Sequence, residues 1–151
     1  MVMKSFRGQI IDEGIDTIVL HTNTGSTGYR IRKFEIMPRI PGATAQETIS
    51  KIFKIPQPDP TVTPPDGVID FADNTLLAAA YYQDSASAGD NQATTVIFDN
   101  EIFNQDIFVT SKDVSGNAQP INYYIELEQI KLSLDQNTVA TLKDIRNITQ
   151  P

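Results

Sequence analysis

The chain has 151 residues, of which 40% are hydrophobic and 21% charged. It is long and apolar enough to fold as one domain, and it carries too little charge for a disordered chain. Its net charge of −7 disfavours nucleic acid and anionic membranes as partners, and the absence of cysteine excludes disulfides and cysteine nucleophiles. No apolar stretch approaches membrane-spanning length and residues 1–5 do not resemble a signal peptide, so we expect a soluble product of the cytoplasm.

Short β patterns separated by turn residues dominate the chain from its start. Residues 5–11 and 16–22 are predicted strands because apolar and polar residues alternate in them. The sequence Asp12-Glu13-Gly14 between them predicts a hairpin connection, with the glycine free to take a positive φ.

The next strand pattern changes phase in its middle. Tyr29 and Ile31 share one alternation, whereas Phe34 and Ile36 share the other. Because a strand presents every second side chain to one face, this change predicts a β-bulge or bend near residues 32–33.

The middle of the chain combines strand patterns with a proline-rich stretch. Residues 48–55 form a predicted strand, and residues 56–67 hold five of the nine prolines, which predicts an extended surface loop or arm. Residues 68–71 are predicted to form a short strand. Residues 76–82 are ambiguous because their alanines favour a helix, but their length and β neighbours favour a buried strand, which is our prediction.

The last part of the chain contains three further predicted strands, at 94–98, 107–110 and 121–128. In the last one, Glu126 and Glu128 are predicted to face outward, and the alternating apolar residues inward: Ile121, Tyr123, Ile125 and Leu127. A capping-box spacing that begins at Ser133 predicts one short C-terminal helix. The fold expected for residues 1–151 is a single all-β domain, an antiparallel, jelly-roll-like β-sandwich with one short C-terminal helix.

No catalytic motif is present in the sequence. His21 is the only histidine, so any Ser-His-Asp triad or histidine metal site has to include it, but a lone strand histidine is more typical of a surface or interface. The G-x-S-x-G, H-E-x-x-H and P-loop patterns are absent. We therefore expect no catalytic, cofactor-binding or metal-binding residues, no cofactor, and a protein that is not an enzyme.

Three polar clusters have alternative interpretations. The oxygen-rich segment 99–106 has ligand types that suit Ca²⁺, but interleaved apolar residues favour a turn with side chain-to-backbone bonds. The acid pairs Glu126/Glu128 and Asp70/Asp73 have no spacing that marks them as catalytic. The basic cluster formed by residues 30, 32, 33 and 39 is interpreted as a solvated strand face.

Several segments resemble small virion proteins of marine tailed phages, of the kind that infect cyanobacteria and abundant ocean bacteria. The resemblance is carried by Ile97-Phe98-Asp99-Asn100-Glu101-Ile102-Phe103 and its continuation to Thr110, by Asn122–Glu128, and by shorter stretches at residues 6–8, 16–18, 28–31 and 141–146. The resemblance implies a structural part of the particle, and it assigns no functional residue.

The expected function is a capsid decoration or cement protein on the outer shell of the virion. Its expected partners are the major capsid protein or other virion proteins and further copies of itself, with a trimer favoured, and no nucleic acid or membrane. The alternatives are a tail, collar or neck component, a glycan-binding receptor module and a hydrolase. A cement protein should expose flat apolar patches and extended arms, whereas a binding module should expose a cleft of aromatic and polar side chains.

Overall fold

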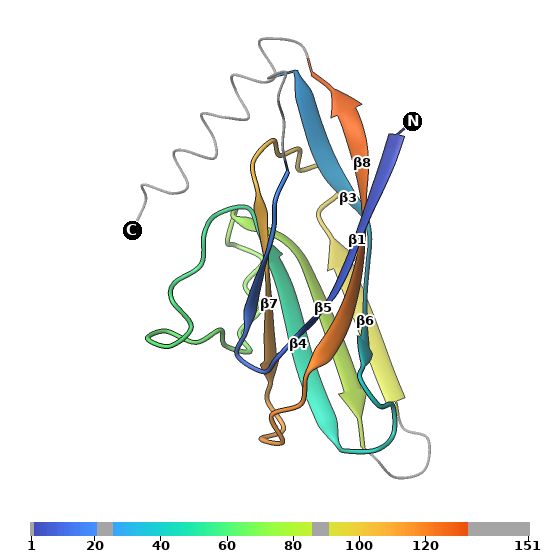
Figure 1. Ribbon diagram of the computed structural model, residues 1–151, viewed down its shortest axis with the longest axis vertical. Helices are drawn as coiled ribbons and strands as arrows, with labels where there is room; N and C mark the ends of the chain where they lie inside the picture. The colour runs from blue at the N-terminus through green and yellow to red at the C-terminus, as the bar shows by residue number, and fades with distance from the viewer. Residues whose placement is uncertain (1, 21–25, 86–90, 133–151) are drawn as a thin grey trace.

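The computed structural model describes residues 2–20, 26–85 and 91–132 (Figure 1). These residues form an antiparallel β-sandwich, which confirms the predicted all-β class. The predicted C-terminal helix lies outside the described residues. The eight strands are β1 (Val2–Ile10), β2 (Ile15–Ile18), β3 (Thr27–Pro38), β4 (Gln46–Phe53), β5 (Leu76–Asp84), β6 (Asn91–Ile97), β7 (Ile107–Asp113) and β8 (Ile121–Lys131).

The strand order is that of a jelly roll with one pair rearranged. One sheet has the order β1-β8-β3 and the other β2-β7-β4-β5-β6. A jelly roll pairs its first strand with its last, its second with its seventh, its third with its sixth and its fourth with its fifth. Here β1–β8, β2–β7 and β4–β5 pair in this way, whereas β6 pairs with β5 and contacts β3 without joining its sheet.

The predicted hairpin at residues 12–14 is wrong. The strands on either side enter different sheets, because β1 pairs with β8 and β2 pairs with β7. The connection is a corner of the sandwich, in which the Glu13 amide donates to the Ser111 carbonyl at 3.0 Å. Glu13 itself takes the positive φ, 59°. Gly14 serves close packing instead, since an added Cβ would lie 2.8 Å from Cγ2 of Ile10 and from the carbonyl oxygen of Ile11.

The predicted bulge in β3 is confirmed. The register with β8 shifts between Ile31 and Lys33. Arg32 and Lys33 are consequently both exposed, and Phe34 returns to the core, where it is buried. A single bulge thus keeps both halves of a long strand packed against the same core.

The core lies between the two sheets, and β8 is the central strand of the three-stranded sheet that forms one side of it. The predicted inward residues of β8 are buried, as expected. Glu126 is half-buried, but Glu128 is not free in solvent, because it is paired with Arg30 at 2.8 Å and with Arg32 at 2.5 Å. Glu128 was predicted to face outward, but the guanidinium groups of Arg30 and Arg32 cover its carboxylate.

The ambiguous segment 76–82 belongs to strand β5, as predicted. Ala78 and Ala80 are buried and pack into the core beside Ile52. Residues 68–71 are described by the structure, and they do not form the predicted strand. The side chains of Asp66 and Asp70 accept the backbone amides of Val68 and Ala72, and these local bonds turn the chain instead.

Candidate functional site

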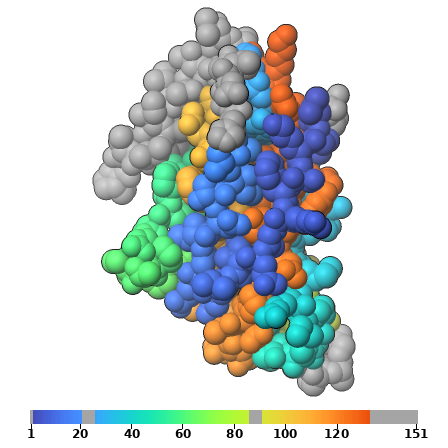
Figure 2. Space-filling view, viewed as in Figure 1, coloured from blue at the N-terminus to red at the C-terminus, as the bar shows by residue number. Residues whose placement is uncertain are grey.

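A long loop between β4 and β5 folds back over the outer face of the five-stranded sheet. We call residues 54–75 the covering loop; it includes the proline-rich stretch 56–67. Figure 1 shows it in green beside β7, and Figure 2 shows it as a protrusion on the left of the molecule. Of the two predicted alternatives, a surface loop or an arm, the structure shows a loop held against its own sheet, and its contact with a neighbouring subunit stays a prediction.

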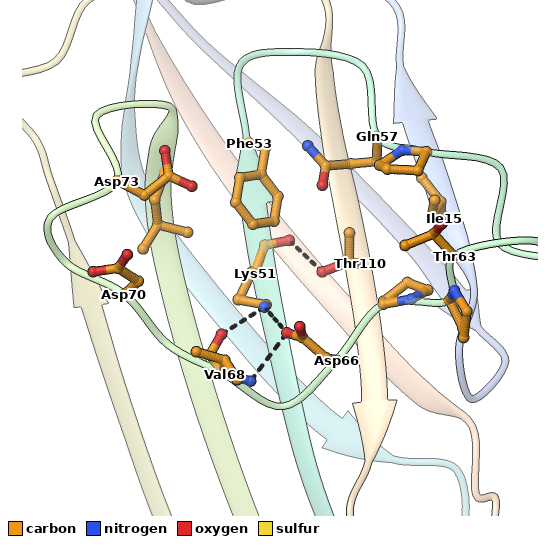
Figure 3. Close-up of a pocket in the computed structure, with 14 residues that line it drawn as sticks. Ile15, Lys51, Phe53, Gln57, Thr63, Asp66, Val68, Asp70, Asp73 and Thr110 are labelled. Carbon is orange, nitrogen blue, oxygen red and sulfur yellow. Dashed lines mark hydrogen bonds and ion pairs between the residues drawn. The ribbon is translucent and has the colours of Figure 1, made fainter. Parts of the chain in front are cut away.

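A buried lysine anchors the covering loop. Lys51 lies on the outer face of β4, and its Nζ donates to Asp66 Oδ1 at 3.1 Å and to the Val68 carbonyl at 2.6 Å (Figure 3). The hydrogen bond from Lys51 holds the pKa of Asp66 below its ordinary value, although burial opposes this shift. The loop in turn buries Lys51, so releasing the loop would break both hydrogen bonds and expose the Lys51 Nζ to water.

A small pocket of about 300 Å³ lies between the covering loop and the sheet. The sheet contributes Ile15, Phe53 and Thr110, and the loop contributes prolines and aspartates (Figure 3). Asp70 and Asp73, one of the two acid pairs, line this pocket but accept the backbone amides of Ala72 and Thr75. These two carboxylates therefore cap turns.

The outer surface of the covering loop is apolar and acidic. Val62 and Phe71 are 79% and 57% exposed, and Val68 and Ile69 are exposed as well. Phe71 is held by an edge-to-face contact with Phe98, with ring centroids 5.3 Å apart. The loop's four acidic residues are Asp59, Asp66, Asp70 and Asp73, and its one basic residue, Lys54, is buried at its start. It is a fixed surface on which hydrophobic side chains face solvent.

The carboxylates of the other predicted clusters also have structural partners. Glu126 accepts the Tyr124 hydroxyl at 2.8 Å, and this bond raises the pKa of Tyr124. In segment 99–106, Asp106 accepts the Leu20 amide at 2.8 Å and Glu101 pairs with Lys54 at 3.5 Å. Among the described residues, no three histidine, cysteine or acidic side chains gather into a possible metal site. His21 lies outside the described residues.

The basic cluster of β3 is part of a mixed-charge sheet face. Arg30 and Arg32 pair with Glu128, and Lys33 lies 3.7 Å from Glu35. Lys33 also lies over the ring of Tyr124. Two acids thus pair with three of the four basic residues of the cluster, as expected for a solvated strand face. In the part of the chain that the structure describes, no helix is long and apolar enough to span a membrane.

A second, larger hollow was not predicted from the sequence. This inter-sheet groove has a volume of about 880 Å³, and both sheets contribute to it: Arg7 and Gly8 of β1, residues 35–37 of β3, Tyr81 of β5, residues 93–95 of β6 and residues 122–124 of β8. The only signal for it in the sequence is the small and polar composition of β6, which supplies few large apolar side chains.

One wall of the inter-sheet groove is held rigidly. Tyr123 is buried, and its hydroxyl donates to Asp16 of β2, so that the bond ties the two sheets together. Burial and the Asp16 carboxylate raise the pKa of Tyr123 far above its ordinary value. Gly8 lies against this ring, because a Cβ added there would be 2.7 Å from the Tyr123 hydroxyl oxygen.

Replacing Gly8 by alanine is expected to lower the free energy of unfolding by about 1–3 kcal/mol, because the new methyl group meets a ring that cannot move freely. Urea unfolding measures the loss. The penalty should be smaller in a Tyr123→Phe background, which removes the atom nearest to the methyl group. Equal penalties in both backgrounds would show that the ring does not cause the effect.

No protein-family model matches the sequence, and a search of curated proteins finds no match. The β-sandwich class comes from the arrangement of the two sheets.

Proposed function

We propose that this chain is a non-enzymatic structural protein of a virus particle, and specifically a decoration protein on the outer face of a capsid shell. The observation that carries the proposal is the covering loop, an anchored segment that exposes a set of hydrophobic side chains. Support also comes from the resemblance to virion proteins of tailed phages and from the jelly-roll-like strand order, since jelly rolls occur in viral capsid domains.

The covering loop has the properties of a docking element. Four exposed hydrophobic residues lie on this one loop, and exposed apolar surface of this kind is typical of surfaces that bind other proteins. The prolines and the Lys51 anchor reduce the conformational freedom that the loop would lose on binding, and this favours affinity. Because a shell repeats one surface many times, weak contacts by an oligomer, such as a trimer, add up to stable attachment.

The charge of the chain favours the outside of the shell. A net charge of −7 repels packaged DNA, so the interior face is unfavourable. The loop carries four aspartates, and its one basic residue, Lys54, is buried, which favours a shell surface with apolar and basic side chains.

Purified particles are expected to carry many copies of this protein, and particles that lack it should assemble but break more easily on heating or osmotic shock. Quantitative mass spectrometry gives the copy number, and release of DNA reports breakage. A handful of copies at the tail or portal vertex would favour the alternative, a tail, collar or neck component. Substrate turnover abolished by changing His21 or one carboxylate would contradict both.

The role of the covering loop is tested by binding to shells that lack the protein. Val62→Ser together with Val68→Ser should weaken binding at least tenfold, because both side chains are exposed on the loop and their loss leaves the core intact. Ile40→Ser is the matched control, since Ile40 is 64% exposed outside the loop. Equal binding by both variants would exclude the covering loop as the contact.

A further inference from the structure

β6 is an edge strand of the five-stranded sheet, and one of its sides is free (Figure 1). It pairs with β5 along its other side, and within the described part of the chain no further strand joins it. All of its residues except Ile97 are exposed. The backbone groups along the free side are therefore accessible to the strand of another molecule.

The pairing with β5 fixes which backbone groups of β6 point to the free edge. The Phe98 amide donates to the Leu77 carbonyl at 3.0 Å, and the register of the two strands, continued by one residue, places these residues directly opposite each other. Hydrogen-bonded pairs alternate in an antiparallel ladder, so the even-numbered residues of β6 bond to β5. The odd-numbered residues present their amide and carbonyl groups to the free edge: Asn91, Ala93, Thr95 and Ile97.

The other edge strands carry features that hinder pairing between molecules, whereas β6 carries none of them. Such features are charged side chains, prolines, bulges and short length. β1 has Lys4 and Arg7, β2 has four residues, and β3 has a bulge, three basic residues and Pro38. β6 has no charged residue, no proline and no register shift, and its second half, residues 94–97, is β-branched. Among the described strands, β6 is the edge best suited to accept a further strand.

The composition of β6 favours a second copy of this chain as the partner. When a strand pairs antiparallel with its own copy, a charge near its centre lies beside the same charge in the copy, which is unfavourable. β6 has no charge, so two chains of net charge −7 can meet along it without like charges in the paired strands. If Thr94 lies opposite Thr94 of the second copy, every free-edge group is matched, because Ala93 then lies opposite Thr95, and Asn91 opposite Ile97.

We propose that β6 pairs antiparallel with β6 of a second copy about a two-fold axis at Thr94, so that one sheet runs through a symmetric dimer. The contact uses the same surface of both copies and closes on itself, and backbone hydrogen bonds hold it together, as in other cases of strand addition. The dimer replaces the trimer favoured from the sequence, because a three-fold axis cannot pair a strand with its own copy. It is independent of attachment to a shell, since β6 contributes no residue to the covering loop.

Sedimentation velocity of the full-length protein should show a dimer in the micromolar range. Thr94→Lys should weaken dimerisation at least tenfold, because it places two lysines opposite each other at the axis. Thr17→Lys is the matched control, since Thr17 is exposed on β2, at the opposite edge of the same sheet, and this variant should dimerise like the wild-type protein. Thr94→Glu alone should also be impaired, whereas an equimolar mixture of Thr94→Lys and Thr94→Glu should dimerise, because opposite charges then meet at the axis.

Amide exchange followed by NMR tests the same contact in the wild-type protein. The amides of Ala93 and Thr95 point to the free edge, so they should be protected in the dimer and should lose this protection on dilution to the monomer.

Three results would overturn the proposal. The first is that the wild-type protein is a monomer throughout the micromolar range, or a trimer. The second is a dimer in which the amides of Ala93 and Thr95 exchange freely, which would assign the contact to another surface. The third is that the mixture of Thr94→Lys and Thr94→Glu dimerises no better than either variant alone, which would exclude an axis at Thr94.

Discussion

Replacing Ile125 by alanine is expected to lower the free energy of unfolding by about 3–4 kcal/mol, because it removes a fully buried side chain from the central strand of its sheet. Ile125 lies opposite Phe6 of β1 and Phe34 of β3, and both sides of the cavity are therefore held by backbone pairing. Neighbouring side chains cannot move far to fill the space, so the loss should lie above the lower end of the range for such substitutions, about 2–5 kcal/mol.

Ile40→Ala is the matched control, since the same methyl and methylene groups are removed from an exposed position. Urea unfolding of both variants at equal protein concentration measures the difference. If Ile125→Ala shifts the unfolding midpoint no more than Ile40→Ala, the register of β8 is different from the one described.

Asp113→Asn is expected to lower the free energy of unfolding by about 2–3 kcal/mol at neutral pH, because Asp113 is a buried carboxylate that accepts several hydrogen bonds. Its oxygens accept the amides of Glu47 at 3.2 Å, Ser115 at 3.0 Å and Gln119 at 3.0 Å. These bonds connect the end of β7 to β4 and to the following turn, in which Gly116 has a φ of 89°. An asparagine keeps the shape but replaces one acceptor oxygen by a donor.

The effect of Asp113→Asn should depend on pH. Burial opposes ionisation of Asp113, but the hydrogen bonds from Ser115, Gln119 and Glu47 outweigh it and lower its pKa. A carboxyl whose pKa is lower in the folded state contributes its stability above the pKa of the unfolded chain, about 3.9, and loses it as the pH falls through the folded value. The difference between the wild-type protein and Asp113→Asn should therefore be largest at neutral pH and should shrink below about pH 4.

Asp99→Asn is the control for this series, because it removes a carboxylate from an exposed turn. Thermal unfolding followed by circular dichroism across the acid range measures both variants. A constant difference between the wild-type protein and Asp113→Asn from neutral to acid pH would contradict the assignment of Asp113 as an ionised hydrogen-bond acceptor.

Patterns that depend on one strand could be predicted from the sequence. The inward set of β8 and the bulge near residues 32–33 follow from alternation alone, because a side chain faces the core or the solvent according to its position in the pleat. The buried strand at Ala78 and Ala80 could be predicted for a different reason, since its length and its β neighbours outweighed the helix preference of alanine.

Features that depend on the choice of partner strand could not be predicted. A tight turn at residues 12–14 is compatible with a hairpin or with a corner, and only the pairing of β1 with β8 and of β2 with β7 distinguishes them. The prolines predicted a surface loop or arm, but not which face of the molecule it covers, because the contact of this loop with Lys51 depends on the fold of the whole sheet.

The sequence by itself determined the all-β class, the position of most strands and the apolar faces that build the core, because these follow from local alternation and turn chemistry. The tertiary structure alone decided that β6 pairs with β5 and not with β3. That choice opens the inter-sheet groove, and it depends on contacts between residues far apart in the chain, which no local pattern encodes.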